Sequence, residues 1–400
     1  EDIGLTALKE ISEDSEAETV PKVIAFTAQQ LLDARDKCTG LRNQIAQQQR
    51  NDKAEAIRQK LDPKNDPHGR SLYQHVRKER TPPTTTMWDE KSGAYTANTN
   101  RIIELVEDAW QPVFNRHAHN PPSWTTFNET YGKYYDNWTT APTNTPQAAD
   151  MHNHARRMRE QSSPGIDGWR PAEVRVLPRT AWQHREQVLN LAIELHTFPT
   201  VYKHVLNPAI PKKTDSDKPL DQRVLSVFPA LYRVEMGAWY RILAPWFHSN
   251  LHPDIHGGVA GHEALEVSWD AQADIEEAIL RNIETLFAAV DYFKYFDSFD
   301  HQWVYGFLQL LGFPIALCDM ILDMYTAIKR YIKLGRAYGL AQIVYNGMGQ
   351  GDHGALFPAV GLVSGQFYMI DALYPKVRKG ACIDDRNFRG SYNDVMGTYH

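Results

Sequence analysis

The sequence predicts an α+β fold that combines amphipathic helices with a few short strands. Helix formers with apolar residues at helical spacing recur along the 400-residue chain. Short apolar runs at 286–290 and 381–383 each end at an aspartate, which is typical of a strand that leads into a turn. Because 42% of the residues are hydrophobic, the chain can bury a sizeable core.

The first 150 residues are expected to form a helical extension and then a polar, less regular stretch. Helix formers at helical spacing fill 21–61, and Pro63 ends this pattern. Prolines and threonines then interrupt regular structure as far as a helical pattern at 100–114. We therefore assign residues 1–65 to a helical N-terminal extension and 66–150 to a polar linker or irregular extension.

The next hundred residues are mainly helical in pattern. The run HVLNPAIPKK at 204–213 resembles a strand and ends in paired lysines. A Pro-Gly turn precedes Asp167, which is a suitable cap for the helix that follows it. The expected helices in this part of the chain are 147–160, 181–198 and 232–247.

Short strands and helices alternate after residue 250. The run at 286–290 predicts a buried strand, 331–352 a hairpin with a glycine-rich turn, and 377–385 the approach to a second aspartate-containing turn. The expected helices are 266–284, 301–313, one that begins at 316, and 355–374.

Charge is unevenly distributed along the chain. The net charge of −6 excludes a uniformly basic nucleic-acid-binding protein. Residues 151–250 carry 14 Lys and Arg against 9 Asp and Glu, whereas residues 251–400 carry 11 against 18. A polyanion-binding surface beside a metal centre would give this pattern, and so would ordinary unevenness of charge.

The three cysteines argue for a reducing compartment. Cys38, Cys318 and Cys382 are few, odd in number and widely spaced, which argues against both a disulfide framework and a zinc cluster. The chain contains no run of eighteen apolar residues, and its first twenty residues lack the features of a signal peptide. We therefore expect no membrane span and no secretion.

Three aspartates form the candidate chemical site. Asp291 follows the first apolar run, and Asp384 and Asp385 follow the second. If the two strands lie side by side, these carboxylates meet and offer the hard oxygen ligands that Mg²⁺ prefers. Two such ions, about 3.5–4 Å apart, activate an attacking oxygen and stabilise a leaving one in nucleotidyl transfer. The alternative is that the aspartates are turn residues of an unrelated globular protein.

Six segments, in one order, resemble the reverse transcriptases of non-LTR (LINE-like) retrotransposons, with group II intron proteins close behind. The resemblance covers about residues 155–395. The segments are SPGIDGWRPAEV, IPKKTDSDKPLDQRVLS, HGGVAGHEALEVSWD, FAAVDYFKYFDSFDH, GMGQGDHGALFPA and CIDD.

The resemblance implies a right-hand polymerase fold. Residues 151–250 would form the fingers, and residues 251–400 a palm built as a small antiparallel sheet backed by helices. The chain ends fifteen residues after Asp385, whereas the family continues with more palm and a helical thumb. We therefore expect a palm that is truncated after its third motif and no thumb.

The resemblance also implies a role for ten residues. Asp291, the carbonyl group of Tyr292 and Asp384 would bind two Mg²⁺ ions, for which Mn²⁺ can substitute, and Asp385 would support the catalytic site. Phe296 would pack under the sugar and exclude a 2′-hydroxyl group. The remaining nucleotide-binding residues would be Lys212 or Lys213 with Arg223 at the triphosphate, and Gln350 and Gly351 at the nucleotide and template.

The implied function is RNA-directed DNA polymerase, a nucleotidyltransferase that adds dNTPs to a primer 3′-hydroxyl group. Its partners would be an RNA template and a DNA or RNA primer, with the nucleus or the cytoplasm as the location. Departures such as His353 and Arg386 leave open an inactive scaffold derived from a reverse transcriptase, or a decayed fragment. A further alternative is an RNA-dependent RNA polymerase, against which Phe296 argues.

Overall fold

The computed structural model describes residues 84–213 and 216–398, together with isolated positions between Asp33 and Gln59. These isolated positions are helical, and the rest of the helical segment predicted at 21–61 lies outside the described residues. Residues 1–80 and 81–400 form two separate compact units. The fold described below is that of the larger unit.

The larger unit begins with a short hairpin and a buried helix, α4. The hairpin strands β1 (Met87–Asp89) and β2 (Ala94–Thr96) pair antiparallel, and α4 spans Thr99–Phe114. The side chain of Asn98 caps α4 by accepting hydrogen bonds from two backbone N–H groups. Because α4 buries five apolar side chains, including Trp110, this part of the range predicted as a linker contributes to the core.

Helices form most of the next segment and confirm the three predicted there. Their bounds are α5 (Trp124–Tyr131), α6 (Ala148–Arg157), α7 (Pro171–Arg175), α8 (Arg179–Glu194) and α9 (Ala230–Asn250), with 3₁₀ turns η1 (Gly132–Tyr135) and η2 (Thr200–Lys203). The prediction that Asp167 caps the helix directly after it is wrong. Its carboxylate accepts a hydrogen bond, 2.9 Å long, from the N–H of Ala230 at the start of α9. The N-cap position of α9 is Pro229, whose side chain forms no capping hydrogen bond.

A mixed sheet joins two distant parts of the sequence. Its strands are β3 (His204–Pro211), β4 (Gln222–Val224), β6 (Lys329–Leu334), β7 (Ala337–Tyr338) and β8 (Gln342–Ile343), and the 3₁₀ turn η3 (Pro219–Asp221) precedes β4. β3 pairs with β4 antiparallel and with β6 parallel, and β7 and β8 both pair with β6 antiparallel. The hairpin predicted at 331–352 is confirmed by β6 and β7. The β3–β6 pairing crosses the boundary at residue 250 that the sequence suggests between fingers and palm.

A second sheet is wholly antiparallel. Its strands lie in the order β5 (Leu286–Val290), β10 (Asp385–Gly390) and β9 (Arg378–Cys382). The neighbouring helices are α10 (Ala264–Leu280), α11 (His301–Leu310), α12 (Ile315–Thr326), α13 (Leu356–Leu373) and α14 (Tyr392–Gly397), with η4 (Phe296–Ser298) before α11. Together the two sheets and their helices confirm the α+β class. The strand predicted at 286–290 is present as β5, but the prediction that it is buried is wrong: it lies at the edge of the sheet, and its residues alternate between half-buried and exposed.

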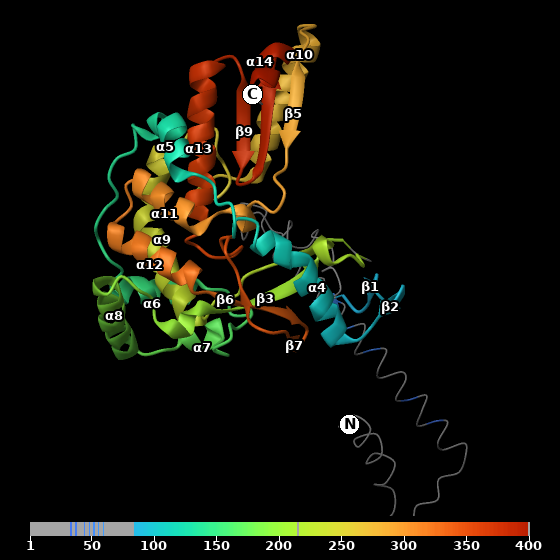
Figure 1. The fold of residues 1–400 in the computed structure, drawn as a ribbon, viewed down its shortest axis with the longest axis vertical. Helices are drawn as coiled ribbons and strands as arrows, with labels where there is room; N and C mark the ends of the chain where they lie inside the picture. Colours follow the sequence, from blue (N-terminus) through green and yellow to red (C-terminus); the bar gives the residue numbers. More distant parts are fainter. Residues whose placement is uncertain are drawn as a thin grey trace, which may run out of the picture. The chain divides into compact units, whose positions relative to one another are not determined.

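Two long helices cover opposite faces of this antiparallel sheet (Figure 1). Val267 of α10 lies against Gly380 of β9, whose cross-strand partner is Asn387. Phe367 of α13 packs on Phe388, the next residue of β10, with ring centroids 6.1 Å apart. Because neighbouring strand residues face opposite sides, α10 and α13 lie on opposite faces.

α13 belongs to the core. Among the described residues it is the one helix whose length and composition would suit a membrane span, with a mean hydropathy of 1.3. More than half of the helix is buried inside the unit, where Phe357 and Phe367 are fully covered. Packing in the core therefore accounts for its apolar composition.

Candidate active site

The antiparallel sheet brings two of the three aspartates to the same end. Val290, the last residue of β5, pairs with Arg386 of β10. Asp291 follows the first of these residues and Asp385 precedes the second, so in an antiparallel pair the two aspartates occupy neighbouring positions. Strand alternation also directs them to the face opposite to that of Val290 and Arg386.

The third aspartate lies in the turn beside them. Cys382 pairs with Asp385 across the β9–β10 hairpin, so Ile383 and Asp384 form a two-residue turn. Ile383 has a φ of 62°, a left-handed conformation that a β-branched residue rarely adopts. The hairpin therefore holds Asp384 through a strained residue, as is often found in functional turns.

The three carboxylates concentrate negative charge at this end of the sheet. Asp291 and Asp385 are exposed and Asp384 is half-buried. Partial burial raises the pKa of Asp385, and the negative charges of Asp384 and Asp291 raise it further. A cation bound nearby relieves repulsion of this kind.

A cavity of about 470 Å³ lies against the carboxylates. Eight of the ten residues predicted from the sequence line it, whereas Lys213 and Gly351 are not among its lining residues. The eight are Asp291, Tyr292, Phe296, Asp384, Asp385, Lys212, Arg223 and Gln350. The structure thus brings together residues that are up to 173 positions apart in the sequence, from Lys212 to Asp385.

Two of the cations that line the cavity come from the mixed sheet. Lys212 directly follows β3, and its N–H group donates to the carbonyl oxygen of Asp221. Arg223 lies in β4, opposite Ile210. Both side chains belong to exposed residues. The cavity is therefore lined by carboxylates from one sheet and by cations from the other.

Lys294 and Trp110 also line the cavity, and sequence reasoning missed both. The Nζ atom of Lys294 donates to the carbonyl oxygen of Leu220, 2.9 Å away, and lies 3.8 Å from the centre of the Trp110 ring. Burial, with a smaller contribution from the positive charge of Lys212, lowers the pKa of Lys294 to about 8. The one sequence signal was the position of Lys294, three residues after Asp291.

Arg386, one of the departures from the family pattern, does not line the cavity. Its buried guanidinium group donates to the hydroxyl groups of Tyr292 and Tyr295 and to the side chain of Gln366 on α13. It also lies 4.3 Å from the centre of the Tyr292 ring. The substitution is thus accommodated on the α13 side of the sheet and leaves the carboxylate end free.

The glycine-rich turn before α13 is fixed by the segment that follows β4. The carbonyl oxygen of Gln350 accepts a hydrogen bond from the N–H of Ser226. Gly351 has a φ of 115°, and a Cβ atom there would lie 3.1 Å from the carbonyl oxygen of Ser226. The Asp352 carboxylate accepts hydrogen bonds from the buried hydroxyl groups of Tyr232 and Tyr325. Gly351 is therefore needed to seat Gln350 at the cavity.

Comparison with known proteins places the chain beside one transposon protein. Over 191 residues it is 24% identical to the "Transposon TX1 uncharacterized 149 kDa protein" of Xenopus laevis. The matched part is 48% of this chain and 15% of that protein, so the chain spans only a small part of the relative's length. No family model matches the chain. The similarity supports a transposon origin.

Proposed function

We propose that the chain forms the fingers and palm of a reverse transcriptase from a LINE-like retrotransposon. The observation that carries this proposal is the cavity in which Asp291, Asp384 and Asp385 share walls with Lys212 and Arg223. Carboxylates beside phosphate-binding cations suit nucleotidyl transfer. The order of the six sequence segments and the similarity to a transposon protein agree with it.

In this proposal, two Mg²⁺ ions, or Mn²⁺ in their place, would bind at the carboxylate end of the cavity. The donors are hard oxygen atoms, and the mutual repulsion that raises the pKa of Asp385 is what a bound cation would relieve. Asp291, the carbonyl group of Tyr292 and Asp384 would hold the ions, with Asp385 in support. When bound, the ions would polarise the primer hydroxyl group and neutralise charge on the phosphates.

The chain's own residues would bind and orient the nucleotide. The forked donors of Arg223 suit a phosphate group, and Lys212 and Lys294 add point charges beside it. Phe296 would limit the space at the sugar, and Gln350 would contact the incoming nucleotide.

The partners in this proposal are an RNA template, a DNA or RNA primer and dNTPs. Because phosphate contacts dominate such binding, the affinity for the template and primer should fall steeply with salt. A template of this kind is met in the nucleus or the cytoplasm, which is the location that we propose.

The test is single-nucleotide addition to an oligo(dT) primer on poly(rA), with Mg²⁺ and with Mn²⁺ in separate reactions. We expect dTMP to be added only when metal is present. Asp291→Asn or Asp384→Asn should lower the rate at least about 100-fold, since losing even an outer partner of a metal ligand costs up to that much. The matched control is Asp136→Asn, at an exposed carboxylate outside the cavity.

Binding of dTTP, measured in parallel as a metal-dependent rise in Tm, separates the alternatives. Addition that survives Asp291→Asn would show that the carboxylates do not carry the reaction. Binding without addition by the wild-type chain would favour the inactive scaffold instead.

A further inference from the structure

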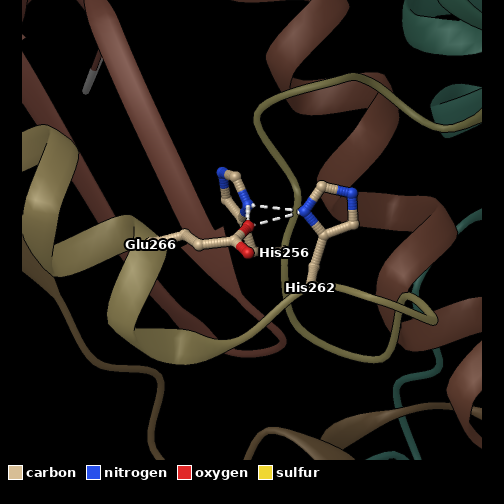
Figure 2. A group of neighbouring side chains, drawn as sticks. All are labelled: His256, His262 and Glu266. Atoms are coloured by element: carbon tan, nitrogen blue, oxygen red, sulfur yellow. Dashed lines mark hydrogen bonds and ion pairs between the residues drawn. The ribbon is translucent and has the colours of Figure 1, made fainter. Parts of the chain in front are cut away.

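Three metal-ligating side chains converge outside the cavity, as Figure 2 shows. The Nδ1 atoms of His256 and His262 lie 2.7 and 2.6 Å from Oε2 of Glu266. The two nitrogen atoms are 3.1 Å apart. His256 and His262 belong to the loop before α10, and Glu266 lies in the first turn of that helix.

Hydrogen bonds alone leave this arrangement crowded, because the two Nδ1 atoms lie only 3.1 Å apart at the same carboxylate oxygen. A neutral imidazole carries a proton on one nitrogen and a lone pair on the other, and an ionised carboxylate only accepts. If both Nδ1 atoms are protonated, two N–H groups are crowded at one oxygen atom. If either Nδ1 is bare, its lone pair faces the lone pairs of Glu266. A divalent cation between the three atoms would use every lone pair.

The donor set indicates the class of metal. Two imidazole nitrogens and one carboxylate oxygen are typical zinc ligands, and a fourth tetrahedral position then stays open. Tetrahedral zinc with ligands near 2.0–2.1 Å places them roughly 3.3 Å apart, so small side-chain rotations suffice. The carboxylate of Asp270 lies 3.9 Å from Nε2 of His256, where it can orient that ring from outside the ligand set.

We propose that His256, His262 and Glu266 bind one Zn²⁺ ion. The site needs none of the cysteines whose spacing argued against a zinc cluster. The sequence signal is the spacing His-x5-His-x3-Glu, in which His262 and Glu266 lie one helical turn apart.

What the loop touches indicates that the ion would hold the loop in place, while its open fourth position is occupied by water. The N–H group of His256 donates to the carbonyl oxygen of Ala381, 2.9 Å away, in β9. The next residue, Gly257, lies so close to the hairpin turn that a Cβ atom there would be 2.4 Å from the backbone nitrogen of Ile383. Zinc would therefore fasten the loop and α10 together beside the turn that presents Asp384.

The inference stands apart from the proposed polymerase activity, because no ligand of this site lines the cavity. The test uses the full chain, stripped of metal with a chelator and dialysed against excess Mg²⁺ to occupy the carboxylates at the cavity. We expect one equivalent of Zn²⁺ to bind in a calorimetric titration and to raise Tm. Co²⁺ should give visible absorption bands of a low-coordinate site, and Zn²⁺ should remove them.

Variants at the exposed His262 and the half-buried Glu266 locate the ion. His262→Ala and Glu266→Gln should each weaken Zn²⁺ binding about 100-fold or more and abolish the rise in Tm. His119→Ala and Glu263→Gln, at exposed residues outside the set, should change neither. The double variant Asp291→Asn with Asp384→Asn should retain the zinc equivalent, which separates this site from the cavity.

Two results would overturn the inference. One is a wild-type chain that binds less than one equivalent of Zn²⁺ under these conditions. The other is equal Zn²⁺ binding by the wild type, His262→Ala and Glu266→Gln, with circular dichroism showing that all three are folded. Either would mean that His256, His262 and Glu266 are joined by hydrogen bonds alone.

Discussion

Phe296 offers a test of sugar selection at the scale of one residue. Phe296 is half-buried and lines the same cavity as Asp291. It follows Asp291 by five residues in the chain. Phe293 also lines the cavity but is 60% exposed. If the cavity holds the incoming nucleotide, the two rings form a matched pair of the same chemistry and different burial.

We expect Phe296→Ala to raise the use of ribonucleotides relative to deoxynucleotides about tenfold, because a smaller side chain leaves room for a 2′-hydroxyl group. The measurement is the ratio of kcat/KM for dTTP and UTP in single-nucleotide addition. Phe293→Ala is the control and should leave the ratio unchanged. An unchanged ratio in Phe296→Ala would assign Phe296 to the core and reopen the RNA polymerase alternative.

On the scale of secondary-structure elements, contact between the loop before α10 and the β9–β10 hairpin sets the position of Asp384. A Cβ atom at Gly257 would lie within 2.4–2.7 Å of backbone atoms of Cys382 and Ile383, which no side-chain rotation can relieve. Gly258, the next residue, has a φ of 77°, but a Cβ atom there would touch only Val360 at 3.4 Å. Substitution of Gly257 would therefore displace the turn, whereas substitution of Gly258 would only strain its own backbone.

We predict that Gly257→Ala moves the β9–β10 turn, lowers stability by about 1–3 kcal/mol and reduces nucleotide addition. Gly258→Ala should also lower stability, through its left-handed backbone, but should leave addition by the folded chain nearly intact. Urea unfolding and initial rates at saturating dTTP measure the two effects. Equal rates in both variants would show that the loop does not position Asp384.

Local sequence patterns predicted the helices and strands better than they predicted how those elements pair and pack. The apolar run at 286–290 predicted the strand β5 but not its exposure, because an apolar run does not show that a strand will lie at the edge of its sheet. The pairing of β3 with β6 was not predicted, since it joins segments more than a hundred residues apart. Asp167 shows the same limit: it caps α9 rather than the helix directly after it.

The sequence predicted those residues of the candidate site that lie in the six segments resembling reverse transcriptases. Eight of the ten predicted residues line the cavity, and each lies in or beside a short strand or turn whose place the motif order implies. Lys294 and Trp110 escaped prediction, since Trp110 lies on a helix outside the resemblance and meets Lys294 only through tertiary packing. The pair His262 and Glu266 was not predicted as a metal site, because two such residues one helical turn apart are common, and only the fold of the loop brings His256 to them.

On the scale of the whole molecule, packing around His154 joins helix α6 to α9 and to the segment before α13. His154 lies on α6, and its Nδ1 atom accepts a hydrogen bond from Nε of Arg241 on α9. Its ring also packs against that of His353, just before α13, and the two ring centroids are 5.2 Å apart. Burial, together with the positive charges of His353, Arg241 and Arg157, lowers the pKa of His154 to about 3. The folded protein therefore holds this ring neutral.

This contact predicts how stability depends on acid. The pKa of His154 is about 3 in the folded chain and near 6.5 when unfolded, so between these values the unfolded chain binds more protons. The contribution of the neutral His154 ring to stability is thus fully present above pH 6.5 and is lost as the pH falls toward 3.

The variant His154→Gln keeps an acceptor for Arg241 but cannot titrate. Its urea midpoint should therefore fall less between pH 7.5 and pH 5 than that of the wild type. The control His184→Gln, at an exposed residue, should show the same fall as the wild type. Part of the fall should remain, because burial also lowers the pKa of His353. An identical fall in wild type and His154→Gln would mean that protonation of His154 does not separate α6 from α9 and α13.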